Sequence, residues 1–172
     1  MAAKVVGPQD GKAGTLGSIG VRQMIDGAES GGGFSLVEHA MPPRRLAAPL
    51  HRHLREDEYS YVLEGRMGAL LGDEVLIAEP GDLVFKPRNQ WHTFWNAGDE
   101  PARILEIIAP AGFEHFFAEL VDGGGAAVMD PADLADLCER YGLEMDPSTV
   151  PGLIERFGLE FPPAAAGAAA AS

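Results

Sequence analysis

Between residues 19 and 109 the chain is a series of short apolar runs, divided by clusters of glycine, proline, aspartate and asparagine. Two of the runs, 21–25 and 34–40, flank the triple glycine at 31–33 and predict a hairpin. The runs that follow are Tyr59–Leu63, Met67–Leu71, Val75–Ala78, Leu83–Lys86, Trp91–Trp95 and Arg103–Ile108. Runs of this length are too short for helices, and their regular spacing is typical of an antiparallel β-sandwich or barrel.

Beyond the last of these runs the periodicity becomes helical. Apolar residues at intervals of three and four predict a first helix that contains Phe113, Phe116, Phe117 and Leu120. Asp130 followed by Pro131 predicts the start of a second helix, and Gly142 predicts its end. The hexapeptide 139–144 is echoed at 155–160, so we expect another helix to end there. Two units are too few for a solenoid, and we expect a small helical appendage on one side of the barrel.

Charge and composition divide the chain further. Residues 1–109 contain 15 acidic and 11 basic side chains, whereas 110–161 contain 11 acidic and only 2 basic ones. The Gly-rich, polar start of the chain predicts a loosely held arm, and its Pro- and Ala-rich end predicts a low-complexity tail. We therefore expect an arm at 1–18, a barrel at 19–109, a helical extension at 110–161 and a tail at 162–172.

Composition excludes several classes of protein. Hydrophobic residues make up 46% of the 172, which rules out wholesale disorder. The formal net charge of −13 disfavours nucleic acids and anionic membrane surfaces as partners, because both require a basic face. Cys138 is the single cysteine and cannot form an internal disulfide. Apolar runs fall short of the roughly 18 residues that cross a bilayer, and the N-terminus lacks the apolar region of a signal peptide, so we expect a cytoplasmic protein.

Two histidines occupy alternate positions of one predicted strand. His51 and His53 therefore point to the same face, where both imidazoles can reach one point. Glu58 begins the next apolar run, and His92 lies in a strand that follows a proline-containing turn. Three neutral imidazoles and one carboxylate suit a divalent first-row transition metal. The alternative is a metal-free barrel whose histidines are packed in the core.

These residues stand in two motifs that resemble those of the cupin superfamily. The first is His51-x-His53-x4-Glu58-x6-Gly65, and the second is Gly81-x5-Pro87-x-Asn89-x2-His92-x3-Asn96. The 15-residue stretch between them is similar to that of compact single-domain microbial cupins. Two positions depart from the pattern, because Arg45 and Asn89 stand where the family usually has glycine. Neither is a ligand position, and asparagine tolerates the left-handed backbone conformation.

The resemblance covers roughly residues 34–109 and implies an all-β fold. This fold is a double-stranded β-helix, the jelly-roll or cupin barrel, here with a C-terminal α-helical appendage. The resemblance also implies that one divalent transition metal per chain is held by His51, His53, Glu58 and His92, with Fe, Mn, Ni, Co, Cu and Zn equally open. In the cupin dioxygenases that this pattern resembles, the glutamate matching Glu58 can also take a proton from the substrate. The alternative is that Glu58 is a ligand only.

The function that the resemblance implies is that of a metal-dependent enzyme, an oxygenase acting on a small, partly apolar organic molecule. Two alternatives stay open, because one fold hosts many chemistries. One is a non-catalytic module that binds a small molecule through the metal, for sensing or storage. The other is a metal-dependent isomerase or lyase that needs no oxygen.

Strand alternation predicts which side chains point into the barrel. The inward positions, which we expect to line a substrate pocket, are Ser60, Val62, Met67, Ala69, Leu71, Phe94 and Asn96. This lining is mostly apolar and contains no arginine or lysine cluster, which disfavours a phosphorylated sugar as substrate. The outward aromatic residues predict a homodimer interface or a surface for helix packing: Tyr59, Tyr61, Trp91 and Trp95. We expect the remaining histidines, His39 and His115, to lie outside the site.

Overall fold

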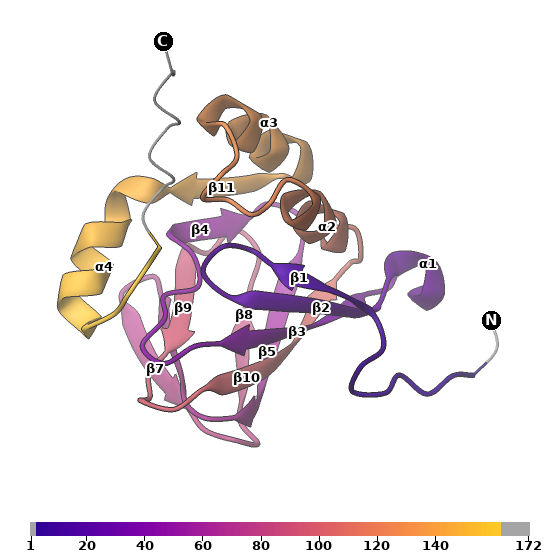
Figure 1. Cartoon of the computed structure of the whole chain (residues 1–172), viewed down its shortest axis with the longest axis horizontal. Helices are drawn as coiled ribbons and strands as arrows, with labels where there is room; N and C mark the ends of the chain where they lie inside the picture. The colour runs from indigo at the N-terminus through magenta and orange to yellow at the C-terminus, as the bar shows by residue number, and fades with distance from the viewer. Residues whose placement is uncertain (1–2, 163–172) are drawn as a thin grey trace, which may run out of the picture.

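The computed structural model describes residues 3–162, which form two antiparallel β-sheets packed into a barrel (Figure 1). The six-stranded sheet has the order β1-β2-β3-β10-β5-β8, and the five-stranded sheet has the order β11-β4-β9-β6-β7. This architecture confirms the predicted all-β jelly-roll barrel. Of the predicted tail at 162–172, all but the first residue lies outside the described part of the chain.

Apart from β1, β4 and β11, the strands overlap the apolar runs of the sequence. The six-stranded sheet contains β1 (Lys12–Thr15), β2 (Gly20–Ile25), β3 (Ser35–Met41), β5 (Asp57–Glu64), β8 (Leu83–Lys86) and β10 (Ala102–Ala109). The five-stranded sheet contains β4 (Leu50–His53), β6 (Met67–Leu71), β7 (Glu74–Ala78), β9 (His92–Asn96) and β11 (Leu143–Asp146). The central strand β10 pairs with β3 on one side and β5 on the other, so residues far apart in sequence face one barrel interior.

The helices are α1 (Gly27–Ser30), α2 (Glu114–Asp122), α3 (Pro131–Tyr141) and α4 (Val150–Phe157), with a 3-10 turn η1 (Pro147–Thr149) before the last. Their boundaries follow the predicted caps. The Asp130 carboxylate accepts a hydrogen bond from the Ala132 N–H at 2.8 Å, at the start of α3. Gly142 and Gly158 end α3 and α4 with a φ of 63°, a left-handed conformation that glycine adopts without strain.

Two strands lie where the sequence pattern predicts none. β1 falls within the segment expected to be a loose arm, yet it pairs with β2 along its whole length. A Cβ at Gly14 would lie 2.3 Å from Val121 Cγ1, so glycine allows this strand to pack directly against α2. β11 falls within the helical extension and pairs with β4. Because the partner that stabilises β11 is about ninety residues away in sequence, no local pattern indicates it.

Among residues 3–162, the buried apolar side chains form three clusters. One fills the barrel interior and includes Met41, Val62, Met67, Ala69, Leu71, Val84 and Ile104. A second lies between the barrel and helices α2 and α3, and includes Val37, Ile108, Phe113, Phe117 and Leu137. In the third, Trp95 of β9 stacks on Phe157 of α4 with ring centroids 4.3 Å apart, as expected of a helix-packing surface. The helical extension therefore shares its core with the barrel.

Helices α2 and α3 lie together over β11 and β4 at one end of the barrel, and α4 lies beside β9 (Figure 1). The end of the barrel that carries β4 is therefore covered by the extension. Within residues 3–162, no helix is both long and apolar enough to cross a membrane.

Candidate metal centre

His51 and His92 face each other across neighbouring strands. β4 and β9 pair at these two residues, and their ring centroids are 4.4 Å apart. In each ring Nδ1 lies 2.9 Å from a backbone carbonyl, that of Pro49 for His51 and that of Gln90 for His92. A carbonyl oxygen only accepts hydrogen bonds, so Nδ1 carries the proton in both rings. Nε2 is then the atom that each ring offers to the barrel interior, with a lone pair when the ring is neutral.

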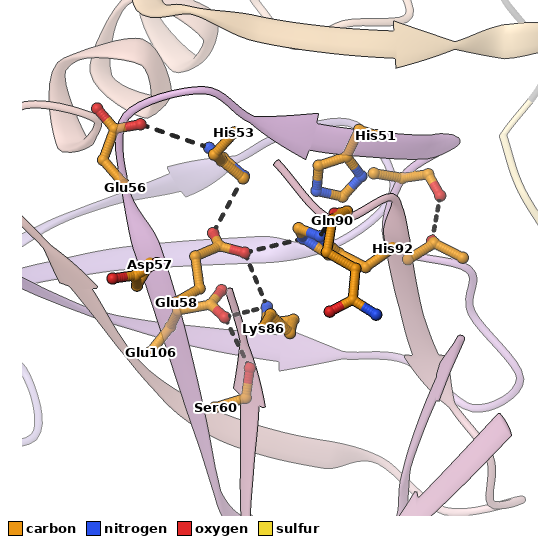
Figure 2. Close-up of polar contacts among 12 residues, drawn as sticks. His51, His53, Glu56, Asp57, Glu58, Ser60, Lys86, Gln90, His92 and Glu106 are labelled. Atoms are coloured by element: carbon orange, nitrogen blue, oxygen red, sulfur yellow. Dashed lines mark hydrogen bonds and ion pairs between the residues drawn. The ribbon is translucent and has the colours of Figure 1, made fainter. Parts of the chain in front are cut away.

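His53 and Glu58 converge on the same point from β4 and β5 (Figure 2). His53 Nε2 lies 3.3 Å from Glu58 Oε1, and His92 Nε2 lies 3.0 Å from Glu58 Oε2. The predicted ligands offer one atom each, all within 4.8 Å of one another, from His51, His53, Glu58 and His92. All four residues are buried. The structure thus brings the predicted ligand set together as a single candidate metal site.

The donor set fits a divalent metal ion. It consists of three imidazole nitrogens and one carboxylate oxygen that lie within 4.8 Å of one another. Such a mixed nitrogen and oxygen set suits first-row divalent metals. Burial, aided by His92 and His53, holds the pKa of His51 well below its ordinary value, and burial also lowers the pKa of His53. Neutral imidazoles are the form that binds metal.

Lys86 is a buried cation next to Glu58. Its Nζ lies 3.0 Å from Glu58 Oε2 and also contacts Glu106 Oε1 (Figure 2). Burial alone would raise the pKa of Glu58, but His53, Lys86 and His92 together hold this pKa well below its usual range. Burial also opposes the charge of Lys86, yet Glu106 and Glu58 raise the pKa of its ammonium group. The Lys86 ammonium group therefore favours the ionised form of Glu58.

Glu106 extends this network away from the ligand group. Its Oε1 accepts a hydrogen bond from Ser60 Oγ at 2.7 Å, and its Oε2 lies 3.2 Å from His39 Nε2. The other ring nitrogen of His39 lies 3.0 Å from the carbonyl oxygen of Gly20. Every charged group in this chain of contacts has a partner of opposite charge or a hydrogen bond, as buried charges require.

The sequence pattern does not place three members of this network in the site. His39, expected outside it, is only 1% exposed and borders the same cavity as the ligands. Lys86 and Glu106 were not among the predicted site residues. A signal for Glu106 does exist, because it stands between the inward residues Ile104 and Ile108 of a strand with alternating burial. A charged residue at an inward position is rarely buried without a specific partner.

A cavity of about 250 Å³ lies over the ligand group, between the barrel and the helical extension. Its polar wall comes from the barrel: His39, His51, His53, Glu58 and Glu106. Its apolar wall comes mostly from the extension and includes Phe113, Phe116, Phe117, Leu120, Leu134 and Phe161. The turn between β1 and β2 borders it as well, through Leu16, Gly17 and Ser18. A small molecule with an apolar body and one polar end matches this division.

Of the residues predicted to line the pocket, Phe94 borders this cavity. The other six are buried, as alternation predicts, but none of them borders the cavity described for residues 3–162: Ser60, Val62, Met67, Ala69, Leu71 and Asn96. Alternation states which face a side chain takes, but not its depth along the barrel axis. Asn96 instead donates hydrogen bonds to the carbonyls of Met41, Pro42 and Glu100. His115 is exposed on α2, as expected.

Comparison with known sequences gives two relatives of similar identity. A family model described as the cupin domain matches residues 37–108. An uncharacterized protein of Methanocaldococcus jannaschii is 32% identical over 88 residues, which are 51% of this chain and 69% of that protein. The tetracenomycin polyketide synthase protein TcmJ of Streptomyces glaucescens is 33% identical over 60 residues, which are 35% of this chain and 40% of TcmJ.

A solved structure resembles the same region. The polyketide cyclase RemF of Streptomyces resistomycificus is 32% identical and superposes with a TM-score of 0.55. The superposition covers 64% of this chain and 81% of RemF. The matched part therefore includes most of RemF, whereas about a third of this chain lies outside the match.

Proposed function

This chain belongs to the cupin superfamily, and from that premise we propose that it is a metal-dependent enzyme acting on a small, largely apolar molecule that carries oxygen donors. The observation that carries the proposal is the cavity, whose polar wall contains all the candidate ligands except His92 and whose opposite wall is aromatic. Ligands for a metal at the base of an apolar pocket of this size favour a substrate bound through its oxygen atoms.

Each group of residues around the cavity has its own role in this proposal. His51, His53, Glu58 and His92 would hold the metal, and the chemistry that it would supply when bound is that of a Lewis acid toward an oxygen of the substrate. The phenylalanines of α2 contact the apolar body of the substrate and exclude water from the reacting end. Lys86 holds one carboxylate oxygen of Glu58 and keeps the group ionised. We propose that Glu58 acts as a ligand, because its lowered pKa makes it a poor proton acceptor.

We propose an oxygen-independent reaction, such as ring closure or isomerisation, as the first candidate. The support is RemF, a polyketide cyclase by name, at 32% identity. The oxygenase implied by the motifs is the second candidate, and in the dioxygenases that the motifs resemble the glutamate matching Glu58 can take a proton from the substrate. A module that only binds its ligand is the third possibility.

Oxygen dependence separates these candidates. The purified protein, loaded with each first-row divalent metal in turn, is incubated with a panel of small phenols and β-dicarbonyl compounds, with and without O₂. Conversion that continues without O₂ supports the first candidate, and conversion coupled to oxygen uptake supports the second. Ligand binding without conversion under either atmosphere contradicts both and leaves the binding module.

The role of Glu58 is tested by Glu58→Gln, which keeps the shape and one oxygen but removes the charge. If Glu58 is a ligand only, the variant binds metal more weakly, its activity tracks metal occupancy, and excess metal restores turnover. If Glu58 is also the general base, as the motif resemblance suggests, the rate per bound metal falls by about 10²–10⁴-fold and excess metal does not restore it. Turnover and metal content are measured on the same samples.

We also propose that the protein is a homodimer. On the outer face of the β5–β8 edge, Tyr61, Leu83 and Phe85 are 39%, 56% and 48% exposed, and Tyr59 stacks on Phe85. A contiguous exposed patch of this kind is uncommon on a monomer. Light scattering at micromolar concentration gives the mass, and Phe85→Glu converts the dimer to a monomer. A monomeric mass for the wild-type protein contradicts this proposal.

A further inference from the structure

The three histidines of the candidate metal centre are not held in the same way. Backbone carbonyls two residues earlier in the chain accept hydrogen bonds from Nδ1 of His51 and of His92. Nδ1 of His53, by contrast, is buried and has no hydrogen-bond partner among residues 3–162. Nothing in the described chain therefore fixes the tautomer of His53 as the two carbonyls fix those of the other ligands.

A second unpartnered atom lies next to it. Glu56 is only 5% exposed, and its Oε2 makes no hydrogen bond within the described residues. This oxygen lies 3.9 Å from His53 Nδ1, across the turn that joins β4 to β5 (Figure 2). Two buried polar atoms without partners, one able to donate a hydrogen bond and the other able to accept it, lie just beyond hydrogen-bond distance. A small side-chain rotation within one turn would satisfy both.

We propose that Glu56 is a positioning residue of the metal centre, whose carboxylate accepts the Nδ1–H of His53. With the proton held on Nδ1, the Nε2 lone pair of His53 points toward Glu58, where the structure places it at 3.3 Å. Metal-bound histidines generally donate their second N–H to such a partner, which fixes the ring and raises its basicity. The inference rests on the metal site of the proposed function.

The arrangement makes metal affinity depend on a side chain outside the ligand set. The orientation of His51 and His92 is set by main-chain carbonyls, which no substitution removes. The orientation of His53 is set by a replaceable carboxylate. Substitution at position 56 should therefore weaken metal binding while leaving all four ligands in place.

The test compares the full chain with Glu56→Leu, which removes the acceptor, and Glu56→Gln, which keeps an acceptor oxygen. Glu74→Gln is the matched control, because it removes the same charge from an exposed position on β7. Zn²⁺ affinity is measured by competition with a chelator. We expect Glu56→Leu to lose about 10–100-fold, Glu56→Gln to lose less, and Glu74→Gln to match the wild type. The melting temperatures of the metal-free proteins show whether each variant is folded.

A second measurement does not depend on the leucine variant being folded. In the Zn²⁺-loaded wild type, NMR of ¹⁵N-labelled imidazoles should show a proton on His53 Nδ1 that exchanges slowly with water, and Glu56→Gln should shift its resonance. A folded Glu56→Leu protein with wild-type affinity overturns the inference, and so does a His53 resonance that Glu56→Gln leaves unchanged. A wild-type protein that binds no Zn²⁺ overturns the metal site itself and, with it, this inference.

Discussion

The barrel and the helical extension contribute opposite walls to one cavity. The barrel wall is polar and charged, with its ligands and their partners on β3, β4, β5, β9 and β10. The wall from the extension is apolar, and Phe116 and Phe117 of α2, with Phe113 just before the helix, supply most of its aromatic rings. The two meet where Phe113 lies edge-on to His53 with ring centroids 4.3 Å apart. Groups for chemistry and groups for shape thus lie on separate stretches of the chain, so we expect a single substitution in one wall to have little effect on the other.

The largest expected effect comes from removing a ligand on the barrel wall. His51→Ala or His92→Ala leaves three of the four ligands, so the purified variant should lose most of its metal while the extension stays packed. Elemental analysis gives the metal content per chain, and circular dichroism shows that the variants are folded. Equal occupancy in wild type and variants would exclude these residues as ligands.

Removing the cation that Glu58 and Glu106 share should lower the free energy of unfolding. Lys86→Met leaves Glu58 and Glu106 buried without their shared cation, so we expect a loss of about 3–5 kcal/mol in the free energy of unfolding. The double variant Lys86→Met/Glu106→Gln removes one charge of each sign and should recover part of that loss. Urea denaturation measures both. A single variant as stable as the wild type would show that this network does not stabilise the barrel.

The smallest effect is expected from a substitution in the helical extension. Phe117→Leu replaces a ring that contacts His39 edge-on at 5.4 Å, and we expect a loss of about 1 kcal/mol of stability, as for a typical single substitution. Metal affinity should stay within a few-fold of wild type, whereas the KM for an apolar substrate should rise. Chelator competition and steady-state kinetics check the two halves of the prediction. A large loss of metal would mean that the two walls are not independent.

The sequence predicts features that depend on neighbours in the chain. The ends of α3 follow from Asp130 and Gly142, and His51 and His53 share a face because strands alternate. Lys86 and Glu106 are different, since each is stable in the core only because the other lies on a strand distant in sequence. The position of the cavity could not be predicted from the sequence either, because strand alternation gives the face on which a side chain lies and not its depth along the barrel axis. The cavity lies where α2 covers the barrel, a contact that no motif encodes.

The pairing of β11 with β4 has a consequence for any shortened form of the protein. β4 carries His51 and His53, and it pairs with β9 only at His51↔His92, whereas it pairs with β11 at four positions. A chain truncated after β10 would leave β4 as a bare edge strand, with its backbone N–H and C=O groups open to other molecules. Such edges seed intermolecular strand addition and aggregation. The motif-bearing barrel is therefore not a self-sufficient unit, and the extension acts as an intramolecular edge protector for the strand that carries two of the ligands.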